Sequence, residues 1–307
     1  MNQKLNFKTV TSFVHGGSRL PAVAVAGAAD DAVLGAVAAG LAEGVGFFLV
    51  GNMDEILQTA GAHELDIRNA ELVDSKDYDE AEICRIAADL CAEGKAGVLM
   101  KGLVGTASFT RALLDKDIGL TEKGSLLSHI GFFAGSGNGK AFLLTDAAIN
   151  ISPDVEVKKK ILSNAVDTAR ALGILEPKIA LLAPVERISP KIQSTVDAAV
   201  LKIWLNGGAL GTVVADGPFA LDVAASREAS AIKGINSPVA GDVDIYFLPN
   251  LDAGNVLYKS LTVFSSISSA GILSGAKVPV VLTSRSDTEE VKIASLGLAL
   301  QIASSRV

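Results

Sequence analysis

Short apolar runs alternate with longer segments of helical period over the first 110 residues of the chain. Strand-like runs occupy residues 20–28, 45–52 and 96–102 (LPAVAVAGA, VGFFLVGN and AGVLMKG), and helix-like segments that begin DDAVLG, MDEILQ and DEAEIC separate them. A shorter run at residues 67–72 fits a further strand. Such alternation is typical of βαβ crossovers and predicts a mainly parallel sheet.

The rhythm changes near residue 128, where two strand-like runs follow each other directly. SHIGFFA (128–134) and KAFLLTDA (140–147) flank the turn-rich segment GSGNG, in which Asn138-Gly139 supplies the positive-φ positions of a tight hairpin. Consecutive antiparallel strands after several βα units indicate the start of a second lobe.

The second lobe resumes the alternation with a helix that has Ser152 as its N-cap and Pro153 at its first position. Further along, the patterns predict helices from Ala253 to Ser266 and around Ser268 to Ser274, a strand VPVVLTS (278–284), and a last helix from Asp287 to Ser304. We expect this last helix to return to the first lobe.

The predicted fold is therefore α/β, with two lobes whose mainly parallel sheets enclose an interlobe cleft. We assign residues 1–127 with 283–307 to the first lobe and residues 128–282 to the second. Clefts at the carboxyl ends of parallel strands are where such proteins usually bind ligands.

The net charge and the lengths of the apolar runs argue against some classes of partner. A formal charge of −7 argues against a nucleic-acid partner, which needs clustered Lys and Arg. No apolar run reaches the roughly 18 residues of a membrane span, and the first residues lack an apolar targeting segment, so we expect a cytoplasmic protein with no membrane partner. Cys84 and Cys91, seven residues apart, face one side of a predicted helix and are interpreted as core residues.

An arginine stands where the apolar strand PVVL stops. Arg285 lies in the segment Thr283-Ser284-Arg285-Ser286, and the acidic residues that follow suit a helix start. A guanidinium is costly to desolvate unless an anion meets it, so this corner is a candidate anion site. The alternative is a surface ion pair with Glu289, which would contribute little to stability.

A second corner has the same architecture. KGLVGTASFTR (101–111) follows the strand AGVLM and brings Thr106, Ser108, Thr110 and Arg111 to the entrance of a helix. Backbone amides, hydroxyls and a guanidinium could converge there on one anion. An ordinary capped helix with a surface arginine is the alternative.

A third polar segment follows the strand DIYFLP and contains Asn250, Asp252, Asn255 and Lys259. The acids nearby could form an oxygen shell for Mg²⁺, but Lys259 disfavours a cation, and the three histidines lack zinc-site spacing, so we expect no metal. The glycine-rich GSGNGK lacks the residues of a phosphate loop, and Asp30 and Asp31 suit helix caps better than a dinucleotide site.

Four segments follow one another in an order that is specific to one family: ADGPFALD (215–222), SPVAGDVDI (237–245), PNLDAGNVLYKSL (249–261) and VPVVLTSRSD (278–287). Through them the chain resembles the phosphate acetyltransferase and phosphate butyryltransferase family. The corner TSRSDTEE is more like the butyryl branch than the acetyl branch, in which LSRG is usual.

The resemblance implies reversible transfer of a short acyl group, butyryl or branched, between coenzyme A and inorganic phosphate. Transfer would be direct, in a ternary complex, with coenzyme A as a substrate and with no bound cofactor, metal or acyl-enzyme. Two lobes like those of isocitrate and isopropylmalate dehydrogenases are implied, as is a homodimer or higher homo-oligomer joined through the second lobe.

The resemblance also suggests roles for individual residues. Arg285 would grip the phosphoryl group with help from Arg111 and Thr106, and Ser284 would hydrogen-bond the transition state or the leaving sulfur. Glu290 is the first candidate for the base, with a helix-start acid as its alternative. The second lobe would add Asn250, Asp252, Asn255 and Lys259 as substrate-binding residues.

Three alternative functions stay open at this point. Phosphate acetyltransferase activity is the nearest alternative, because one methylene in an apolar pocket changes binding by only about 1 to 3 kcal/mol. A metal-dependent decarboxylating dehydrogenase would need clustered acids and a nicotinamide site, which the sequence does not indicate. A non-catalytic module that binds coenzyme A or acyl phosphate would bind without turnover.

Overall fold

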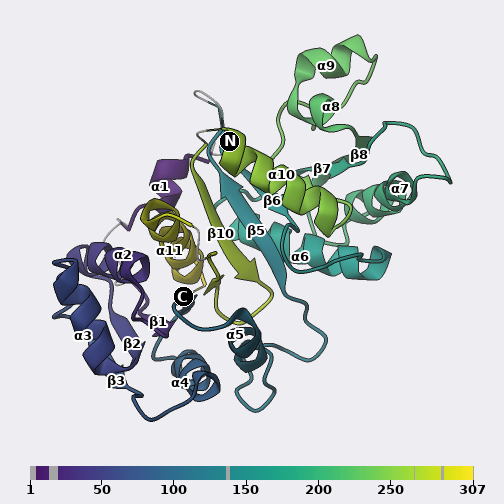
Figure 1. Cartoon of the computed structure of the whole chain (residues 1–307). Coiled ribbons are helices and arrows are strands. Elements are labelled where there is room, and N and C mark those ends of the chain that lie inside the picture. Colours follow the sequence, from purple (N-terminus) through teal and green to yellow (C-terminus); the bar gives the residue numbers. More distant parts are fainter. Residues whose placement is uncertain (1–4, 14–19, 136–138, 266, 285–286, 307) are drawn as a thin grey trace. The chain divides into compact units, whose positions relative to one another are not determined.

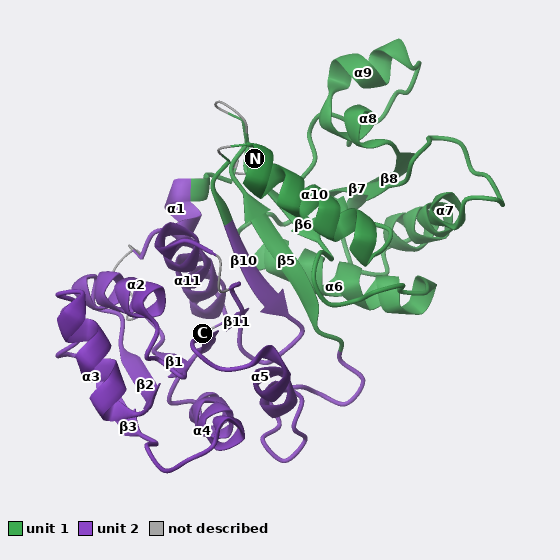
Figure 2. Ribbon diagram, viewed as in Figure 1, with its two compact units in different colours: residues 1–7, 126–269 green, residues 8–125, 270–307 purple. Residues whose placement is uncertain are grey.

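The chain forms two compact units, each built on a β-sheet flanked by helices (Figures 1 and 2). A computed structural model describes residues 5–13, 20–135, 139–265, 267–284 and 287–306. Unit 1 comprises Met1–Phe7 and Leu126–Ser269, and unit 2 comprises Lys8–Ser125 and Ala270–Val307. Residues 270–282, which the sequence assigned to the second lobe, thus group with the N-terminal unit.

Unit 2 has the strand order β3-β2-β1-β4-β11-β10. Strands β1 to β4 and β11 run parallel, and β10 is antiparallel to β11. The strands are β1 (Val23–Ala26), β2 (Phe47–Gly51), β3 (Glu71–Asp74), β4 (Val98–Lys101), β10 (Ser269–Ser274) and β11 (Val280–Val281). The helices are α2 (Asp31–Ala42), α3 (Met53–Ala62), α4 (Glu80–Ala92), α5 (Thr106–Leu113) and α11 (Glu289–Ser304).

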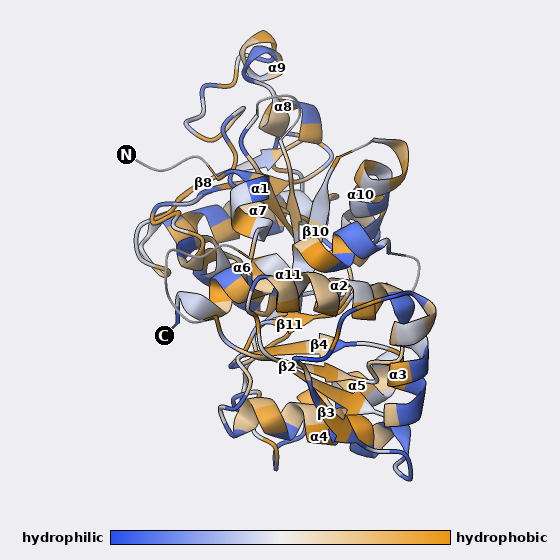
Figure 3. Cartoon of the chain, turned by 90° about the vertical axis from the view of Figure 1, so that its left-hand side faces the viewer, coloured by the Kyte–Doolittle hydropathy of each residue, from blue (hydrophilic) through white to orange (hydrophobic). Residues whose placement is uncertain are grey.

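The central strands of unit 2 are buried, as is usual in a parallel sheet. Strands β1 and β4 are buried at every position, as expected for strands covered by helices on both faces. In Figure 3, β2 and β4 are coloured mainly as hydrophobic, whereas α3 carries hydrophilic positions. The Asp30 carboxylate accepts the Val33 N–H at 2.9 Å, which confirms its predicted role as the cap of α2.

Unit 1 has the strand order β5-β6-β9-β7-β8. The predicted β5–β6 hairpin is confirmed as an antiparallel pair, although Asn138 of its turn lies outside the described residues. The remaining pairs are parallel. The strands are β5 (Ser128–Phe133), β6 (Phe142–Thr145), β7 (Lys178–Leu182), β8 (Val214–Phe219) and β9 (Ile245–Phe247). The helices are α6 (Val155–Ala171), α7 (Gln193–Asn206), α8 (Leu221–Ala225), α9 (Arg227–Ile232) and α10 (Leu251–Phe264). Helix α1 (Phe7–Thr11) begins at the last residue of the N-terminal part of unit 1 and otherwise belongs to unit 2.

Two local predictions were wrong. The segment around 268–274 is strand β10 and not a helix, and its six residues are all buried, as in an interior strand. Helix α6 begins at Val155 instead of Pro153, since the Asp154 side chain, and not that of Ser152, accepts the Val157 N–H. The fold class itself, α/β with mainly parallel sheets, is confirmed.

Three further observations bear on function. Within the described residues, no helix combines the length and the apolar character needed to cross a membrane. No group of three or more His, Cys, Asp or Glu side chains suited to a metal ion occurs in the same described part of the chain. Cys84 and Cys91 are buried free thiols, and burial raises their pKa values to about 11 and about 12, which fits the core role predicted for them.

Candidate active site

The carboxyl ends of β4 and β11 lie side by side in unit 2. The two strands are parallel neighbours, with Val280 opposite Leu99 and Val281 opposite Met100. Lys101 comes directly after Met100, and Leu282 separates Val281 from the corner that begins at Thr283. Both corners that the sequence singled out therefore start from one edge of one sheet.

The Ser284 corner is closed by its own hydrogen bonds. The Ser284 N–H donates to the Asp287 carboxylate at 2.7 Å, and the Asp287 N–H donates to the Ser284 carbonyl at 3.1 Å. The buried ammonium of Lys292, one turn into α11, donates to the Asp287 carbonyl at 2.8 Å. Ser284 itself is exposed, whereas Arg285 lies outside the described residues.

Glu290 lies in the first turn of α11 and is exposed. A hydrogen bond from the Thr288 hydroxyl, together with a backbone hydrogen bond, lowers the pKa of its carboxyl group below the ordinary value. The carboxylate is therefore ionised at neutral pH, as a base must be, but the same position suits a helix-start acid equally well.

The second corner is a short helix with a carboxylate at its start. Thr106 opens α5 and is exposed, and Arg111 lies exposed in its last turn. A side chain at the N-cap, Gly105, would come within 2.9 Å of Glu80 Oε1. The Glu80 carboxylate thus lies at the N-terminus of α5, the position that the sequence had suggested for a bound anion.

The polar segment of unit 1 follows β9, and two of its four predicted residues make hydrogen bonds to backbone groups. Asn250 caps α10 by accepting the Ala253 N–H at 3.0 Å, and the Asn255 amide donates to the Ala147 carbonyl at 3.1 Å. Asp252 and Lys259 are exposed on α10. All four belong to unit 1, whereas Ser284, Glu290, Thr106 and Arg111 belong to unit 2.

Asp146 is a buried carboxylate that the sequence analysis did not single out. Its Oδ1 accepts the backbone N–H groups of Ala148 and Ile149, and its Oδ2 accepts the Asn150 amide at 2.6 Å. Helix α10 passes close to this turn, because a Cβ on Gly254 would lie 2.0 Å from the Asp146 carbonyl oxygen. The turn therefore fixes where α10 begins.

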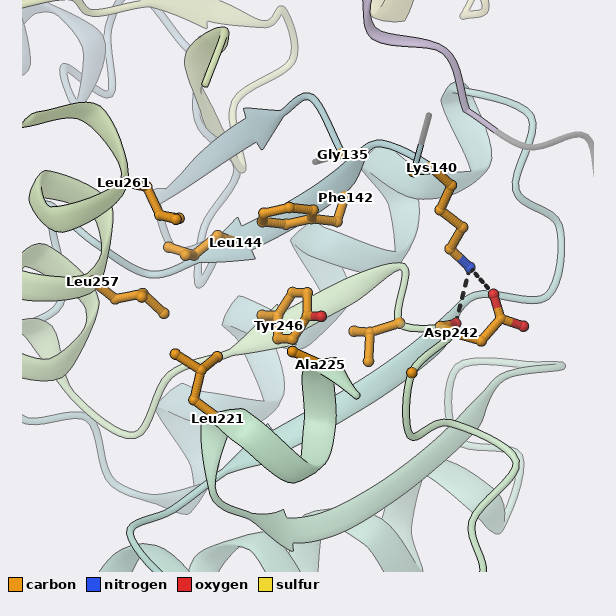
Figure 4. A pocket seen from close by; sticks show the side chains of 13 residues that line it. Gly135, Lys140, Phe142, Leu144, Leu221, Ala225, Asp242, Tyr246, Leu257 and Leu261 are labelled. Atoms are coloured by element: carbon orange, nitrogen blue, oxygen red, sulfur yellow. Dashed lines mark hydrogen bonds and ion pairs between the residues drawn. The ribbon is translucent and has the colours of Figure 1, made fainter. Parts of the chain in front are cut away.

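A cavity of about 460 Å³ occupies the other end of unit 1 (Figure 4). Apolar side chains from β6, β9, α8 and α10 point into it, namely those of Phe142, Leu144, Leu221, Ala225, Tyr246, Leu257 and Leu261. The Lys140–Asp242 pair lies at one side of the cavity. The cavity lies toward the amino ends of β6 and β9, away from the turn after β6. None of the predicted site residues lines it.

The fold places the protein in the class of α/β proteins with mainly parallel sheets, which usually bind ligands outside the carboxyl ends of their strands. Residues 80–299 match the family described as Phosphate acetyl/butaryl transferase. The chain belongs to this family, so the resemblance seen in the sequence is confirmed.

Individual relatives agree with this family. The chain is 41% identical over 285 residues to a phosphate butyryltransferase of Clostridium acetobutylicum, covering 92% of this chain and 94% of that protein. It is 39% identical over 258 residues to a phosphate acetyltransferase of Rhizobium meliloti, covering 84% and 81%.

Solved structures give the same result for the fold. A branched-chain phosphotransacylase from Enterococcus faecalis V583 superimposes with a TM-score of 0.83 at 36% identity, covering 92% of this chain and 99% of that one. A 4-hydroxythreonine-4-phosphate dehydrogenase from Klebsiella pneumoniae shares the fold alone. It superimposes with a TM-score of 0.59 at 13% identity, covering 92% of this chain and 99% of that one.

Proposed function

We propose that the protein transfers a short acyl group reversibly between coenzyme A and inorganic phosphate. A phosphate oxygen attacks the thioester carbonyl, the carbon–sulfur bond breaks, and the proton lost by phosphate ends on the thiol of coenzyme A. The products are acyl phosphate and free coenzyme A. The observation that carries the proposal is family membership over most of the chain, joined to the paired strand ends of β4 and β11.

The residues of unit 2 would divide this chemistry among them. Arg285 grips the phosphoryl oxygens with help from Arg111 and Thr106, and Ser284 hydrogen-bonds the transition state or the leaving sulfur. In the reverse direction, Glu290 accepts the thiol proton of coenzyme A as the thiolate attacks the acyl phosphate. The exposure of Ser284 and Glu290 and the ionised state of Glu290 support these roles.

The residues of unit 1 would contact phosphate or the pantetheine arm of coenzyme A. Asp252 and Lys259 are exposed and available for such contacts. Asn250 and Asn255 already make backbone hydrogen bonds, so their contribution would include holding the start of α10 in place.

The acyl preference that we propose is butyryl or a branched short chain. The phosphate butyryltransferase and branched-chain phosphotransacylase relatives support it, while the 39% identical phosphate acetyltransferase keeps acetyl as the second candidate. Release of thiol from acetyl-, butyryl- and isobutyryl-CoA in the presence of phosphate decides between them. A preference of tenfold or more for acetyl-CoA would exclude the first choice.

We also propose a homodimer or higher homo-oligomer that forms through unit 1. Helix α10 exposes Val256, Val263 and Phe264, with 66%, 68% and 87% of their surfaces accessible, which is unusual for large apolar side chains on one helix. Light scattering of the wild type and of Phe264→Asp tests this assembly. A cytoplasmic location stays a prediction.

The mutant Arg285→Ala tests whether the protein is an enzyme of this kind or a module that only binds its ligands. We expect a loss of about 3 kcal/mol or more in transition-state stabilisation with an unchanged melting temperature. Arg187→Ala, which removes an exposed arginine after β7, is the matched control. Unchanged turnover in Arg285→Ala would refute this placement of phosphate, and ligand binding without any turnover in the wild type would favour the module.

A further inference from the structure

The cavity of unit 1 lies apart from every residue that the proposed function uses. Its volume is about 460 Å³, and cavities of roughly 300 to 1,000 Å³ are those that hold small-molecule ligands. The paired strands β6 and β9, in which Leu144 lies opposite Tyr246, form one wall, and α8 and α10 form others (Figure 4). All lining residues fall within Leu126–Ser269, so the cavity belongs to unit 1 alone.

The helical walls of the cavity are apolar. Leu257 and Leu261 are one turn apart on α10, and Leu221 and Ala225 are one turn apart on α8, so each pair presents one apolar face to the cavity (Figure 4). Leu221 and Ala225 are exposed, and the cavity is therefore open to solvent beside α8. A ligand with an apolar body would remove this surface from water, which is favourable.

The Tyr246 side chain places a hydroxyl group in the apolar wall. Its ring packs edge-on against Phe142, with the ring centroids 5.1 Å apart, and no described residue forms a hydrogen bond with its hydroxyl. Burial raises the pKa of Tyr246 to about 12, so the phenol is protonated at neutral pH and can donate a hydrogen bond. A tyrosine hydroxyl in such surroundings usually has a partner, and a ligand with an acceptor oxygen would supply one.

The charged cluster at one side of the cavity has an excess of positive charge. Lys140 forms ion pairs with Asp242 and Asp244, each at 2.8 Å, Lys178 pairs with Asp242, and Arg227 lies 3.8 Å from the same carboxylate. The cluster thus has three cations against two carboxylates. In Figure 4 the Tyr246 hydroxyl points toward the side on which Lys140 and Asp242 lie. The charge at this side favours an anionic group on a ligand over a cationic one.

We propose that this cavity binds an aliphatic carboxylate, with its chain among the leucines of α8 and α10 and its carboxylate accepting a hydrogen bond from the Tyr246 hydroxyl. At roughly 30 Å³ for each water-sized group, the cavity has room for on the order of 15 such groups, which accommodates a chain of about eight carbons. The inference does not depend on the proposed function, because none of the predicted site residues lines the cavity.

The test measures binding to the full chain at pH 7 by isothermal titration calorimetry. Three probes share one chain length and differ in the charge of the head group: octanoate, 1-octanol and octylamine. We expect octanoate to bind at least fivefold more tightly than 1-octanol, and octylamine to bind most weakly. Binding of octylamine or 1-octanol as tight as that of octanoate would overturn the assignment of a carboxylate.

Two variants place the bound probe. Tyr246→Phe removes only the hydroxyl, and we expect it to weaken octanoate binding at least fivefold, since hydrogen bonds to charged groups are the strong ones. Ala225→Phe adds a ring at an exposed position of the cavity wall and should weaken octanoate binding at least tenfold. The matched controls are Tyr78→Phe in unit 2 and Ala231→Phe on α9, both exposed and away from the cavity, and both should stay within twofold of the wild type.

Octanoate binding that is unchanged in Tyr246→Phe and in Ala225→Phe would overturn the proposal, because the probe would then bind elsewhere. Absence of octanoate binding to the wild type, together with a changed oligomeric state of Ala225→Phe in light scattering, would also overturn it and would identify the cavity as a contact between copies of the chain. If Ala225→Phe does not fold, the octanoate affinity of Tyr246→Phe decides.

Discussion

The backbone N–H of Ser284 donates to the carboxylate of Asp287 at 2.7 Å. Asp287 thereby fixes the backbone of the residue that we place next to the reacting atoms, and Lys292 in turn holds the Asp287 carbonyl. The geometry of the corner thus depends on a side chain that has no part in the proposed chemistry. Asp287 is a positioning residue in this account.

Replacing Asp287 tests the corner directly. Asp287→Ala removes the acceptor, and we expect kcat to fall about tenfold or more, in line with the loss of a charge-assisted hydrogen bond. Asp287→Asn keeps an oxygen that can accept the Ser284 N–H, so its kcat should stay within about threefold of the wild type. Equal effects of the two substitutions on kcat would contradict a positioning role.

The identity of the base can be read from the pH dependence of kcat/KM. Because the pKa of Glu290 is lowered from its ordinary 4.5, an acid limb that this residue controls should lie below pH 4.5. Glu290→Gln should remove the limb and lower kcat about a hundredfold, while Glu289→Gln, the neighbouring exposed acid, serves as the control. Activity of Glu290→Gln near the wild-type level would move the base elsewhere.

The start of α10 depends on the absence of a side chain at Gly254. Gly254→Ala would place a Cβ 2.0 Å from the Asp146 carbonyl oxygen, and the backbone must move to relieve the clash. We expect a loss of about 3 kcal/mol or more in the free energy of unfolding, measured with urea. In the control, Gly61→Ala, the new Cβ meets no atom within 4 Å in helix α3, so stability should stay equal or rise slightly.

Acid should weaken the cluster beside the cavity of unit 1. Burial alone would raise the pKa of Asp242, but hydrogen bonds from Lys140 and Lys178 outweigh it and hold the pKa at about 2, against an ordinary 3.8. A lowered carboxyl pKa contributes stability that is present above pH 3.8 and is lost as the pH falls toward 2. The melting temperature of Asp242→Asn should therefore lie below that of the wild type at pH 6, and the difference should shrink between pH 4 and 2. A difference that does not change with pH would contradict this origin.

Local patterns were enough to predict much of the fold. The βα alternation of the first 110 residues and the hairpin after residue 128 rest on period and turn chemistry, which neighbouring residues determine. Strand β10 was missed because its small residues, in the sequence SAGILS, suit a helix locally, and its burial in the sheet decides otherwise. A tertiary effect of this kind leaves no local trace.

The site was predictable in its residue types but less so in its contacts. The corners that contain Thr106 and Ser284 were each recognised from residues that follow a strand, yet their common sheet edge depends on the pairing of β4 with β11, some 180 residues further along the chain. Asn250 and Asn255 were recognised as a polar cluster, but their hydrogen bonds to backbone groups become visible only in the folded chain.

The most direct test of the central claim is phosphate-dependent release of thiol from butyryl-CoA, followed together with the ³¹P NMR signal of the product. The account predicts that thiol appears only when phosphate is present, that one acyl phosphate forms for each thiol, and that added coenzyme A reverses the reaction. Thiol release at the same rate without phosphate would contradict it, because water and not phosphate would then be the acyl acceptor.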